Sequence, residues 1–366
     1  MKQGWEIKKL GEVCNINYGT RVVQKKDGGT VYPVYGGGGA TFKMDRYNRE
    51  DCLIVSRFAM SNQCVRYVSG KFFLNDSGLT IESNELELSQ PFLDKHIIAL
   101  NDTIYSLGKG VAQKNLDIKE LKLLDIKFPK SLEEQERIVA ELDCLSGVIE
   151  RKREQLRELD ALAQSIFHQM FGDPITNEKR WEVKKLGEVG KVITGNTPST
   201  KDEENYSSND YCFVKPSDIG KDYVTKIENT EFYISEKAFS QSRRLSKGSV
   251  LTTCIGIIGK VGILKVDATC NQQINAILPD ENSISEYVAW AIYLTRSVLE
   301  NIANAPVVPI INKGEFSNIV IPLPPKALQQ EFADKIEAIE KQKELIKKSI
   351  SETENLFNAR MDYYFN

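Results

Sequence analysis

The stretch "WEIKKLGEV" at residues 5–13 recurs as "WEVKKLGEV" at residues 181–189, and this repetition organises the whole chain. The copies differ only where Ile7 becomes Val183, which keeps a β-branched side chain. An internal repeat of this quality indicates a duplicated architecture. The alternative is a shared entry motif without deeper symmetry, and it requires that no other feature recurs in the same order.

A second pair of segments does recur in the same order. The stretch "LKLLDIKFPKSLEEQERIV" at 121–139 has its counterpart in "FSNIVIPLPPKALQQEFAD" at 316–334. Each shows a strand-like alternation, a turn containing proline, the pair Gln-Glu and a long charged helix. Gln135-Glu136 aligns with Gln330-Glu331 at an offset of 195 residues, against 176 for the opening repeat. The sequence therefore predicts a duplication whose second globular half is the longer one.

Composition narrows the class of protein. The chain has 366 residues, a net charge of −3, two histidines and seven cysteines, none of which form a CxxC pair. Scattered thiols of odd number fit a reducing compartment and support neither disulfides nor a zinc site. No apolar run approaches the ~20 residues of a membrane span, and the N-terminus lacks the apolar core of a signal peptide. We expect a cytoplasmic protein without a bound metal or cofactor.

Two long helices follow the globular parts. Apolar residues alternate at steps of four and three, which is typical of a coiled-coil stripe. Each stripe is too long for one small domain to cover, so we expect the two helices to cover each other. Antiparallel pairing is favoured over parallel or intermolecular pairing, because the second domain lies between the helices and the duplication is nearly symmetric. Lys152 and Lys343 interrupt the stripes, and they either extend to the edge or mark where a partner packs. The stripe positions are Ile138, Leu142, Leu145, Ile149, Leu156, Leu159, Ala163, Ile166 and Met170, then Phe332, Ile336, Ile339, Ile346, Ile350 and Phe357.

The globular parts read as short strands broken by polar loops. The stretch "GSVLTTCIGIIGKVGIL" at 248–264 has the same style as "DCLIVSRFAMSNQCVRYV" at 51–68. The predicted fold class is α+β, with two β-rich mixed domains, two antiparallel coiled-coil helices and an internal pseudo-twofold duplication. The predicted boundaries are 1–130 for the first domain, 131–172 for the first helix, 173–325 for the second domain and 326–366 for the second helix.

The sequence resembles the DNA-specificity subunits of type I restriction–modification systems over its whole length. The resemblance rests on the repeated opening segment, "YPVYGGGGA" at 32–40, "TGNTPST" at 194–200, the 248–264 core and "PLPPKALQQEFADKIEAIE" at 322–340. It implies two target-recognition domains for a bipartite, asymmetric double-stranded DNA target. It also implies assembly with two modification (methyltransferase) subunits and two restriction (translocase and endonuclease) subunits, with no membrane partner.

Glycine-rich stretches do not indicate nucleotide chemistry. "GGGG" at 36–39 lacks the following GK[ST] of a P-loop. We expect a flexible turn with positive φ, in preference to a direct DNA contact. "GIIGKVG" at 256–262 lacks GxGxxG spacing and precedes a strand, so we expect a tight β-turn. The chain is expected to be non-catalytic. Two alternatives stay open: a free-standing methyltransferase or nuclease with degenerate motifs, and a bivalent scaffold that binds proteins or glycans.

Neither domain shows an evident basic recognition helix, so we expect loops and strand ends to contact DNA. Arg and Lys can neutralise phosphates or read guanine, and Asn and Gln can hold adenine through two hydrogen bonds. Singly, each charged residue is as well explained as an ordinary solvated group. The candidate DNA-binding residues are Arg21, Lys25, Lys26, Tyr35, Ser56, Arg57, Asn75, Lys215, Ser217, Arg243, Arg244, Thr253, Lys260, Asn271 and Gln272.

Overall fold

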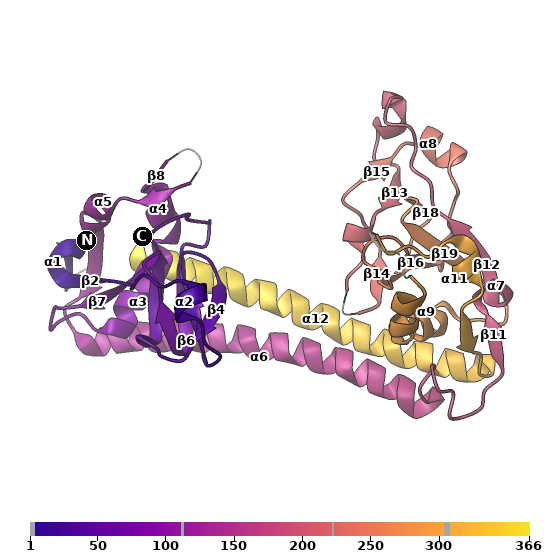
Figure 1. Cartoon of the computed structure of the whole chain (residues 1–366), viewed down its shortest axis with the longest axis horizontal. Coiled ribbons are helices and arrows are strands. Elements are labelled where there is room, and N and C mark those ends of the chain that lie inside the picture. The colour runs from indigo at the N-terminus through magenta and orange to yellow at the C-terminus, as the bar shows by residue number, and fades with distance from the viewer. Residues whose placement is uncertain (1–3, 111–112, 222, 304–307) are drawn as a thin grey trace. The chain divides into compact units, whose positions relative to one another are not determined.

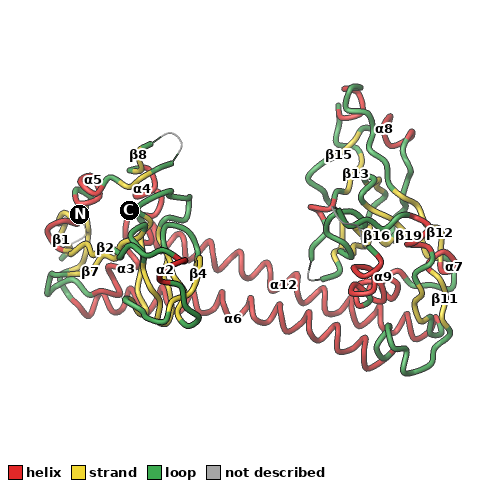
Figure 2. The backbone as a smooth tube through the Cα atoms, in the orientation of Figure 1, coloured by secondary structure: helices red, strands yellow, loops and turns green. Residues whose placement is uncertain are grey.

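A computed structural model describes residues 4–110, 113–221, 223–303 and 308–366 of the chain (Figure 1). The chain folds into two compact units, one of residues 1–152 and 348–366 and the other of residues 153–347. Both units mix strands and helices (Figure 2), which confirms the predicted α+β class. No helix in the described ranges is long and apolar enough to cross a membrane.

The first unit is built on a six-stranded sheet with the order β2-β7-β5-β6-β3-β4. Neighbouring strands are antiparallel except β3 and β6, which run parallel. Helix α3 packs against β6 and β7 of this sheet. The elements are β1 (Trp5–Lys9), α1 (Leu10–Val13), β2 (Cys14–Tyr18), α2 (Gln24–Asp27), β3 (Tyr32–Tyr35), β4 (Ala40–Met44), β5 (Arg49–Ser56), β6 (Val65–Leu74), β7 (Gly78–Ser83), α3 (Gln90–Ala99), α4 (Asn101–Ser106), β8 (Gly108–Lys109), β9 (Asn115–Leu116), α5 (Ile118–Lys122) and β10 (Asp125–Pro129).

The second unit contains a five-stranded sheet, β12-β19-β16-β17-β14, and a three-stranded sheet, β15-β13-β18. The antiparallel run β12-β19-β16-β17 repeats the run β2-β7-β5-β6 of the first unit, which supports the duplication. The elements are β11 (Val183–Lys185), α7 (Leu186–Val189), β12 (Gly190–Thr194), η1 (Glu203–Tyr206), β13 (Tyr211–Val214), η2 (Pro216–Asp218), β14 (Thr225–Ile227), β15 (Tyr233–Ile234), α8 (Glu236–Gln241), β16 (Val250–Thr253), β17 (Val261–Leu264), β18 (Ala268–Cys270), β19 (Ile274–Pro279), α9 (Ser285–Leu294), α10 (Arg296–Ile302), α11 (Lys313–Ser317) and β20 (Val320–Pro322).

The opening repeat forms the same small substructure twice. Strand β1 pairs antiparallel with β10, and β11 pairs antiparallel with β20. The turn that follows is capped in both copies, because the Glu12 carboxylate accepts from the Lys9 N–H and Glu188 accepts from the Lys185 N–H. The recurring residues are therefore retained because they join the start of each globular domain to its last strand.

Two helices of equal length, α6 (Leu132–Phe171) and α12 (Lys326–Phe365), contribute to both units. In the first unit the Tyr364 hydroxyl donates to Glu141 over 2.7 Å, and in the second unit Lys343 donates to Asp160 over 2.7 Å. The partner number in α12 falls as the residue number in α6 rises. The predicted antiparallel pairing is confirmed.

The helix ends also complete the cores of the globular domains. Phe365 lies in the core of the first unit with its ring 5.3 Å from that of Phe92. Phe167 lies in the core of the second unit, 5.4 Å from the ring of Phe332. Each globular core thus includes the end of the helix that belongs to the other repeat, a feature that the coiled-coil pattern alone did not predict.

A buried glutamine near the start of each long helix corrects one detail of the repeat. Gln135 donates to Pro129 O and Glu87 O and accepts from the Ser89 N–H, all within 2.9 Å. In the second unit the corresponding contacts, to Pro324 O, Asn282 O and the Ile284 N–H, are made by Gln329 and not by the exposed Gln330. The helices are therefore related by 194 positions, and the predicted match of Gln135 with Gln330 is wrong by one residue.

Candidate nucleic-acid interface

A crossing of two chain segments is built in the same way in both units. In the first unit the Gly19 N–H donates to Gly78 O and the Thr20 N–H donates to Leu74 O, each over 3.0 Å. In the second unit the same pattern joins Gly195 to Ile274 over 3.0 Å and Asn196 to Cys270 over 2.9 Å. We call these two places the crossings. They place the loops that follow β2 and β12 beside the loops that precede β7 and β19.

Each crossing depends on a glycine because two backbones touch there. A Cβ atom on Gly19 would lie 1.9 Å from Asn75 O, and one on Gly195 would lie 2.3 Å from Asn271 O. Real Cβ atoms do not approach backbone oxygen that closely, so only glycine fits. This role of Gly195, within the "TGNTPST" stretch, was not predicted. Its signal in the sequence is the alignment of Gly195 with Gly19 at the offset of the opening repeat.

Asn75 and Asn271, both predicted to contact DNA, occupy equivalent positions at the crossings. The Asn75 Oδ1 accepts from the Ser77 N–H over 2.9 Å, and the Asn271 Oδ1 accepts from the Gln273 N–H over 3.1 Å. Both backbone N–H groups are also bonded, to Tyr35 O and Val214 O. This is the local turn that asparagine side chains favour. The arrangement makes both residues turn formers.

Ser56 and Thr253 are likewise equivalent, and both are buried. The Ser56 Oγ donates to Gly37 O over 2.6 Å, and the Thr253 Oγ1 donates to Ile257 O over 2.6 Å. Their exposed fractions are 1% and 0%. Both side chains hold the neighbouring loops in place and are separated from the surface in this structure. Their predicted contact with DNA stays a prediction.

The segment of four glycines at 36–39 is not the positive-φ turn that we expected. None of the four glycines has a positive φ. Close approach explains two of them, since a Cβ on Gly36 would lie 2.7 Å from Asn75 Oδ1 and one on Gly37 would lie 2.4 Å from Phe58 O. By contrast, the turn at 256–262 does contain positive φ, 78° at both Gly256 and Gly259, and it closes the hairpin of β16 and β17 as predicted.

Arg66 holds the glycine segment and was missed by sequence reasoning. Its guanidinium donates to Gly38 O, to Gly37 O over 3.0 Å and to Gln63 O over 2.9 Å. Three carbonyl acceptors fix the arginine and the loop together. An arginine in the middle of a strand-like segment carries no signal in the sequence that would have identified this role.

Arg57 lies among exposed aromatic rings beside the first crossing. Its guanidinium carbon is 4.8 Å from the centre of the Tyr18 ring and 4.6 Å from that of Phe58. Tyr18 is 47% exposed and Phe58 is 36% exposed. Stacking on two rings restricts the guanidinium and leaves its hydrogen-bond donors for a ligand. Of the predicted residues in this unit, Arg57 has the geometry best suited to a nucleic-acid contact.

The remaining candidates of the first unit are spread around this point. Arg21 is exposed and follows Thr20 of the crossing, whereas Lys25 and Lys26 are exposed on the short helix α2. Tyr35 is half-buried, and its ring packs 5.4 Å from that of Phe72 at the end of β3. The structure thus brings Arg21, Tyr35 and Arg57 to the crossing and places the two lysines on a neighbouring turn.

In the second unit, three candidates gather at η2. Lys215 precedes this turn, and its Nζ lies 3.0 Å from the centre of the Phe232 ring. The Lys260 Nζ donates to Pro216 O over 2.7 Å, which ties the β16–β17 hairpin to η2. Ser217 is exposed on the same turn. Lys215 in the second unit therefore contacts an aromatic ring, as Arg57 does in the first unit.

The other candidates of the second unit lie beside the second crossing. The Arg243 Nη1 donates to Thr194 O over 2.8 Å, and the Gln272 Oε1 accepts from the Thr197 hydroxyl over 2.6 Å. Arg244 donates to Ser240 O over 3.1 Å and lies 5.4 Å from the centre of the Phe239 ring. All three side chains belong to exposed residues.

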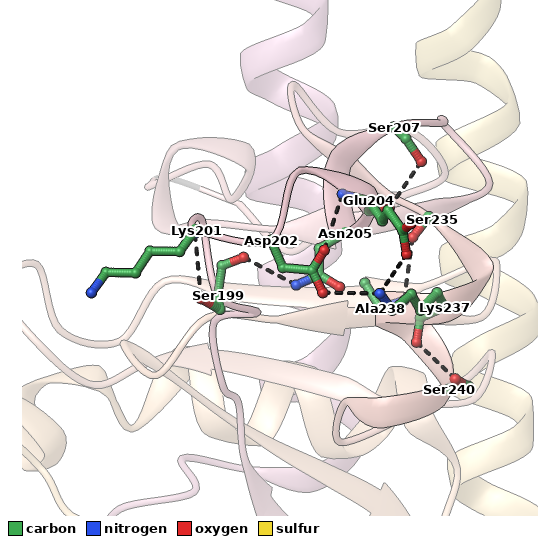
Figure 3. Close-up of polar contacts among 10 residues, drawn as sticks. All are labelled: Ser199, Lys201, Asp202, Glu204, Asn205, Ser207, Ser235, Lys237, Ala238 and Ser240. Carbon is green, nitrogen blue, oxygen red and sulfur yellow. Dashed lines mark hydrogen bonds and ion pairs between the residues drawn. The ribbon is translucent and has the colours of Figure 1, made fainter.

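A polar network supports the segment between the second crossing and Arg243 (Figure 3). The Lys237 Nζ joins Asp202 Oδ2 over 3.0 Å and Glu204 Oε2 over 2.5 Å, and these contacts raise the pKa of the Lys237 ammonium. The buried Asn205 donates to Ser199 O over 3.0 Å. In Figure 3 the Lys201 side chain points away from this network. The network joins η1 to α8 and was not predicted from the sequence.

Five of the seven cysteines are poorly suited to nucleophilic chemistry. Burial raises the pKa of the Cys14, Cys254 and Cys270 thiols to about 12 and that of the Cys52 and Cys64 thiols to about 11. Thiols with such pKa values stay protonated and are poor nucleophiles at neutral pH. No group of three or more His, Cys, Asp or Glu residues that could hold a metal ion occurs in the described part of the chain.

The chain that forms these two crossings and duplicated sheets matches a known protein family. Residues 2–160 and 178–355 match the family described as "Type I restriction modification DNA specificity domain". The chain belongs to this family. The two matched segments each take in one globular domain and most of a long helix, so the predicted duplication and the resemblance are confirmed.

Individual relatives agree with the family assignment. The chain is 32% identical over 182 residues to the specificity subunit of the type I restriction enzyme MjaIX of Methanocaldococcus jannaschii, covering 46% of this chain and 42% of that protein. It is 30% identical over 167 residues to the EcoR124I/EcoR124II specificity subunit of Escherichia coli, covering 43% of this chain and 39% of that protein. The aligned segments thus span less than half the length of these relatives.

Solved structures share the fold over the whole chain. The S subunit of a type I restriction–modification system from M. genitalium matches with a TM-score of 0.62 and 16% identity, covering 99% of this chain and 96% of that one. A chain from a structure on complex assembly and conformational transition of the type I R-M system matches with a TM-score of 0.59 and 19% identity, covering 100% and 98%. At these identities the likeness establishes the fold.

Proposed function

We propose that this chain is the DNA-recognition subunit of a type I restriction–modification complex and that each globular domain reads one half of a bipartite, asymmetric target. The observation that carries the proposal is the repeated crossing. The same backbone framework, Gly19 with Asn75 and Gly195 with Asn271, presents loops of unrelated sequence in the two units. A constant framework with divergent loops suits two readers with different specificities.

The division of labour among residues follows from their surroundings. Asn75, Asn271, Ser56 and Thr253 shape the loops, because their side chains are engaged in the turns. Exposed cations and their aromatic supports remain for phosphates and base edges. The proposed DNA contacts are Arg21, Lys25, Lys26, Tyr35 and Arg57 in the first domain, with Lys215, Ser217, Arg243, Arg244, Lys260 and Gln272 in the second.

The proposal includes the organisation of the complex. Residues 1–130 and 173–325 form the recognition domains, and residues 131–172 and 326–366 form the spacer helices. The chain itself is non-catalytic, binds no cofactor and works in the cytoplasm. Two modification subunits methylate adenine, and two restriction subunits translocate and cleave DNA. Family membership and the duplicated architecture support this organisation.

A domain exchange tests the proposal. Replacing residues 15–115 with the corresponding segment of a relative leaves β1, α1, α5 and β10 in place. The first unit therefore retains the two-stranded sheet of β1 and β10. Mapping of methylated adenines in cells that express the hybrid with its modification subunit should show one half-site changed and the other retained. A change in both half-sites, or methylation unaffected by the exchange, would contradict the proposal that each domain recognises its half-site independently.

The non-catalytic role has its own measurement. The pure chain, incubated with labelled S-adenosylmethionine and duplex DNA, should transfer no methyl group. Addition of the modification subunit should restore transfer. Transfer by the chain alone would favour a free-standing methyltransferase.

A further inference from the structure

The second unit contains a cavity of about 480 Å³ on the open side of the edge strand β12. Its floor is the stretch of β12 from Val192 to Thr194. Lys191, Arg243, Arg244 and Lys313 complete the lining. Four cationic residues from three separate segments of the chain therefore line one hollow.

Among the described residues, no acidic side chain balances these four charges. The lining contains no Asp or Glu, and none of the four cations forms an ion pair with a carboxylate in the described part of the chain. Glu315, on the same short helix as Lys313, accepts from the Asn312 N–H over 2.9 Å and does not line the cavity. A hollow with several cations and no counter-charge favours an anion.

The two guanidinium groups are held in advance. Arg243 is fixed by Thr194 O, and its backbone N–H donates to Asn196 Oδ1 over 2.9 Å. Arg244 is fixed by Ser240 O and by the Phe239 ring, which itself stacks on Tyr211 with ring centres 3.7 Å apart. Because each guanidinium uses one donor on a backbone carbonyl oxygen, its remaining donors are available to a ligand at little further entropic cost.

The equivalent strand of the first unit lacks this arrangement. Lys191 corresponds to Asn15 at the offset of the opening repeat, and the cavity beside β2 is lined by Glu50 and Glu82 together with Arg49. Carboxylates in that cavity disfavour an anion. Among the described residues, a hollow lined by cations without carboxylates therefore lies beside β12 and not beside the equivalent strand β2.

We propose that the cavity beside β12 binds a backbone phosphate of the DNA flanking the half-site read by the second domain. The inference rests on the proposed function and deepens it, because it makes the phosphate contacts of the two domains with their half-sites unequal. Guanidinium and ammonium groups suit phosphate, and a phosphate contact positions the protein without reading sequence. The second domain supplies the phosphate contact, and the first domain relies more on Arg57 between the Tyr18 and Phe58 rings.

Salt dependence tests the proposal. The full chain, assembled with its modification subunits, is titrated with target and unrelated duplexes between 50 and 200 mM salt. Log affinity falls as log salt rises, and the double variant Lys191→Gln/Lys313→Gln should make this dependence less steep by about 1. Affinity for target and unrelated DNA should fall by the same factor. Lys191→Arg/Lys313→Arg should keep the wild-type slope, and Lys347→Gln, an exposed lysine on α12, is the matched control.

Phosphate ethylation interference locates the contact. In the wild-type complex, ethylation beside the second half-site should weaken binding, and the double Gln variant should lose this sensitivity. An unchanged slope in the double Gln variant overturns the proposal, as does a loss confined to the target duplex. Loss of subunit assembly in the double Gln variant, with assembly kept in the double Arg variant, also overturns it and assigns the hollow to a carboxylate of a partner subunit. Failure of the wild-type complex to prefer its target would instead contradict the proposed function.

Discussion

The Lys343 ammonium lies 2.7 Å from Asp160 Oδ1, inside the helix pair of the second unit. The register of 194 residues between the long helices makes Ile149 the counterpart of Lys343 in α6. The Lys343 side chain is 6% exposed and also contacts Glu340 over 2.9 Å. Burial lowers the pKa of this lysine, but the hydrogen bonds to Asp160 and Glu340 outweigh it and leave the pKa raised. The lysine therefore stays charged, and its ammonium is paired between the two helices rather than extended to the edge of the apolar stripe.

The first prediction concerns this pair. Lys343→Ile should lower the free energy of unfolding by about 1–3 kcal/mol, because Asp160 and Glu340 lose their partner. The double variant Lys343→Ile/Asp160→Leu should recover part of that loss, since one of the two stranded carboxylates is gone. Denaturant unfolding of the full chain measures both, with Lys347→Ile as the exposed control. Equal stability of wild type and Lys343→Ile would show that the buried pair contributes nothing net.

A second prediction distinguishes two adjacent glutamines. Gln329→Met should cost about 2–4 kcal/mol, because the Ile284 N–H and the Pro324 carbonyl lose a buried partner. Gln330→Met should cost less than about 0.5 kcal/mol, as Gln330 is exposed on the same helix. Thermal unfolding of the two variants under identical conditions provides the comparison. The reverse order would restore the alignment of Gln135 with Gln330.

The third prediction addresses the crossings. Gly195→Ala should abolish recognition of the second half-site and leave recognition of the first, because the new Cβ would collide with Asn271 O and displace the loop. Gly19→Ala should do the opposite through Asn75 O. Binding to duplexes that contain one correct and one scrambled half-site reads out each domain. Gly38→Ala, where a Cβ meets no atom within 4 Å, should behave as wild type.

The fourth prediction is a pH dependence that originates in His96. This imidazole is fully buried against Phe365, neither nitrogen has a hydrogen-bond partner among the described residues, and burial lowers its pKa to about 3. Below about pH 6.5 the unfolded chain gains a proton that the folded chain does not, so wild-type stability falls as the pH decreases. His96→Leu should remove about 2 kcal/mol of this loss between pH 7 and pH 5.

The measurement for His96 is the difference in unfolding free energy between pH 7 and pH 5, taken for wild type and variant. Comparing each protein with itself cancels the packing change that the substitution introduces. The same pH difference in both proteins would show that His96 takes up its proton without unfolding.

Local patterns were sufficient for the architecture. The repeated opening segment, the four-three spacing from Ile138 to Met170 and the second series from Phe332 predicted the duplication, the long helices and their pairing. These features can be predicted because each is a pattern among residues that are close together in the sequence. The exposed arginines beside the crossings were found for the same reason, since charge clusters such as Arg243-Arg244 stand out in a linear sequence.

The sequence by itself thus determined that the chain is a duplicated α+β protein with two long paired helices, because repeats and periodicity are local. Only the tertiary structure decided which contacts most of the predicted site residues make within the chain. It made Ser56 and Asn75 loop formers, chose Gln329 over Gln330, paired Lys343 with Asp160, and gathered Lys191 and Lys313 beside Arg243. Each of these outcomes depends on a contact between residues that can be far apart in the chain, and such contacts leave no periodic trace in the sequence.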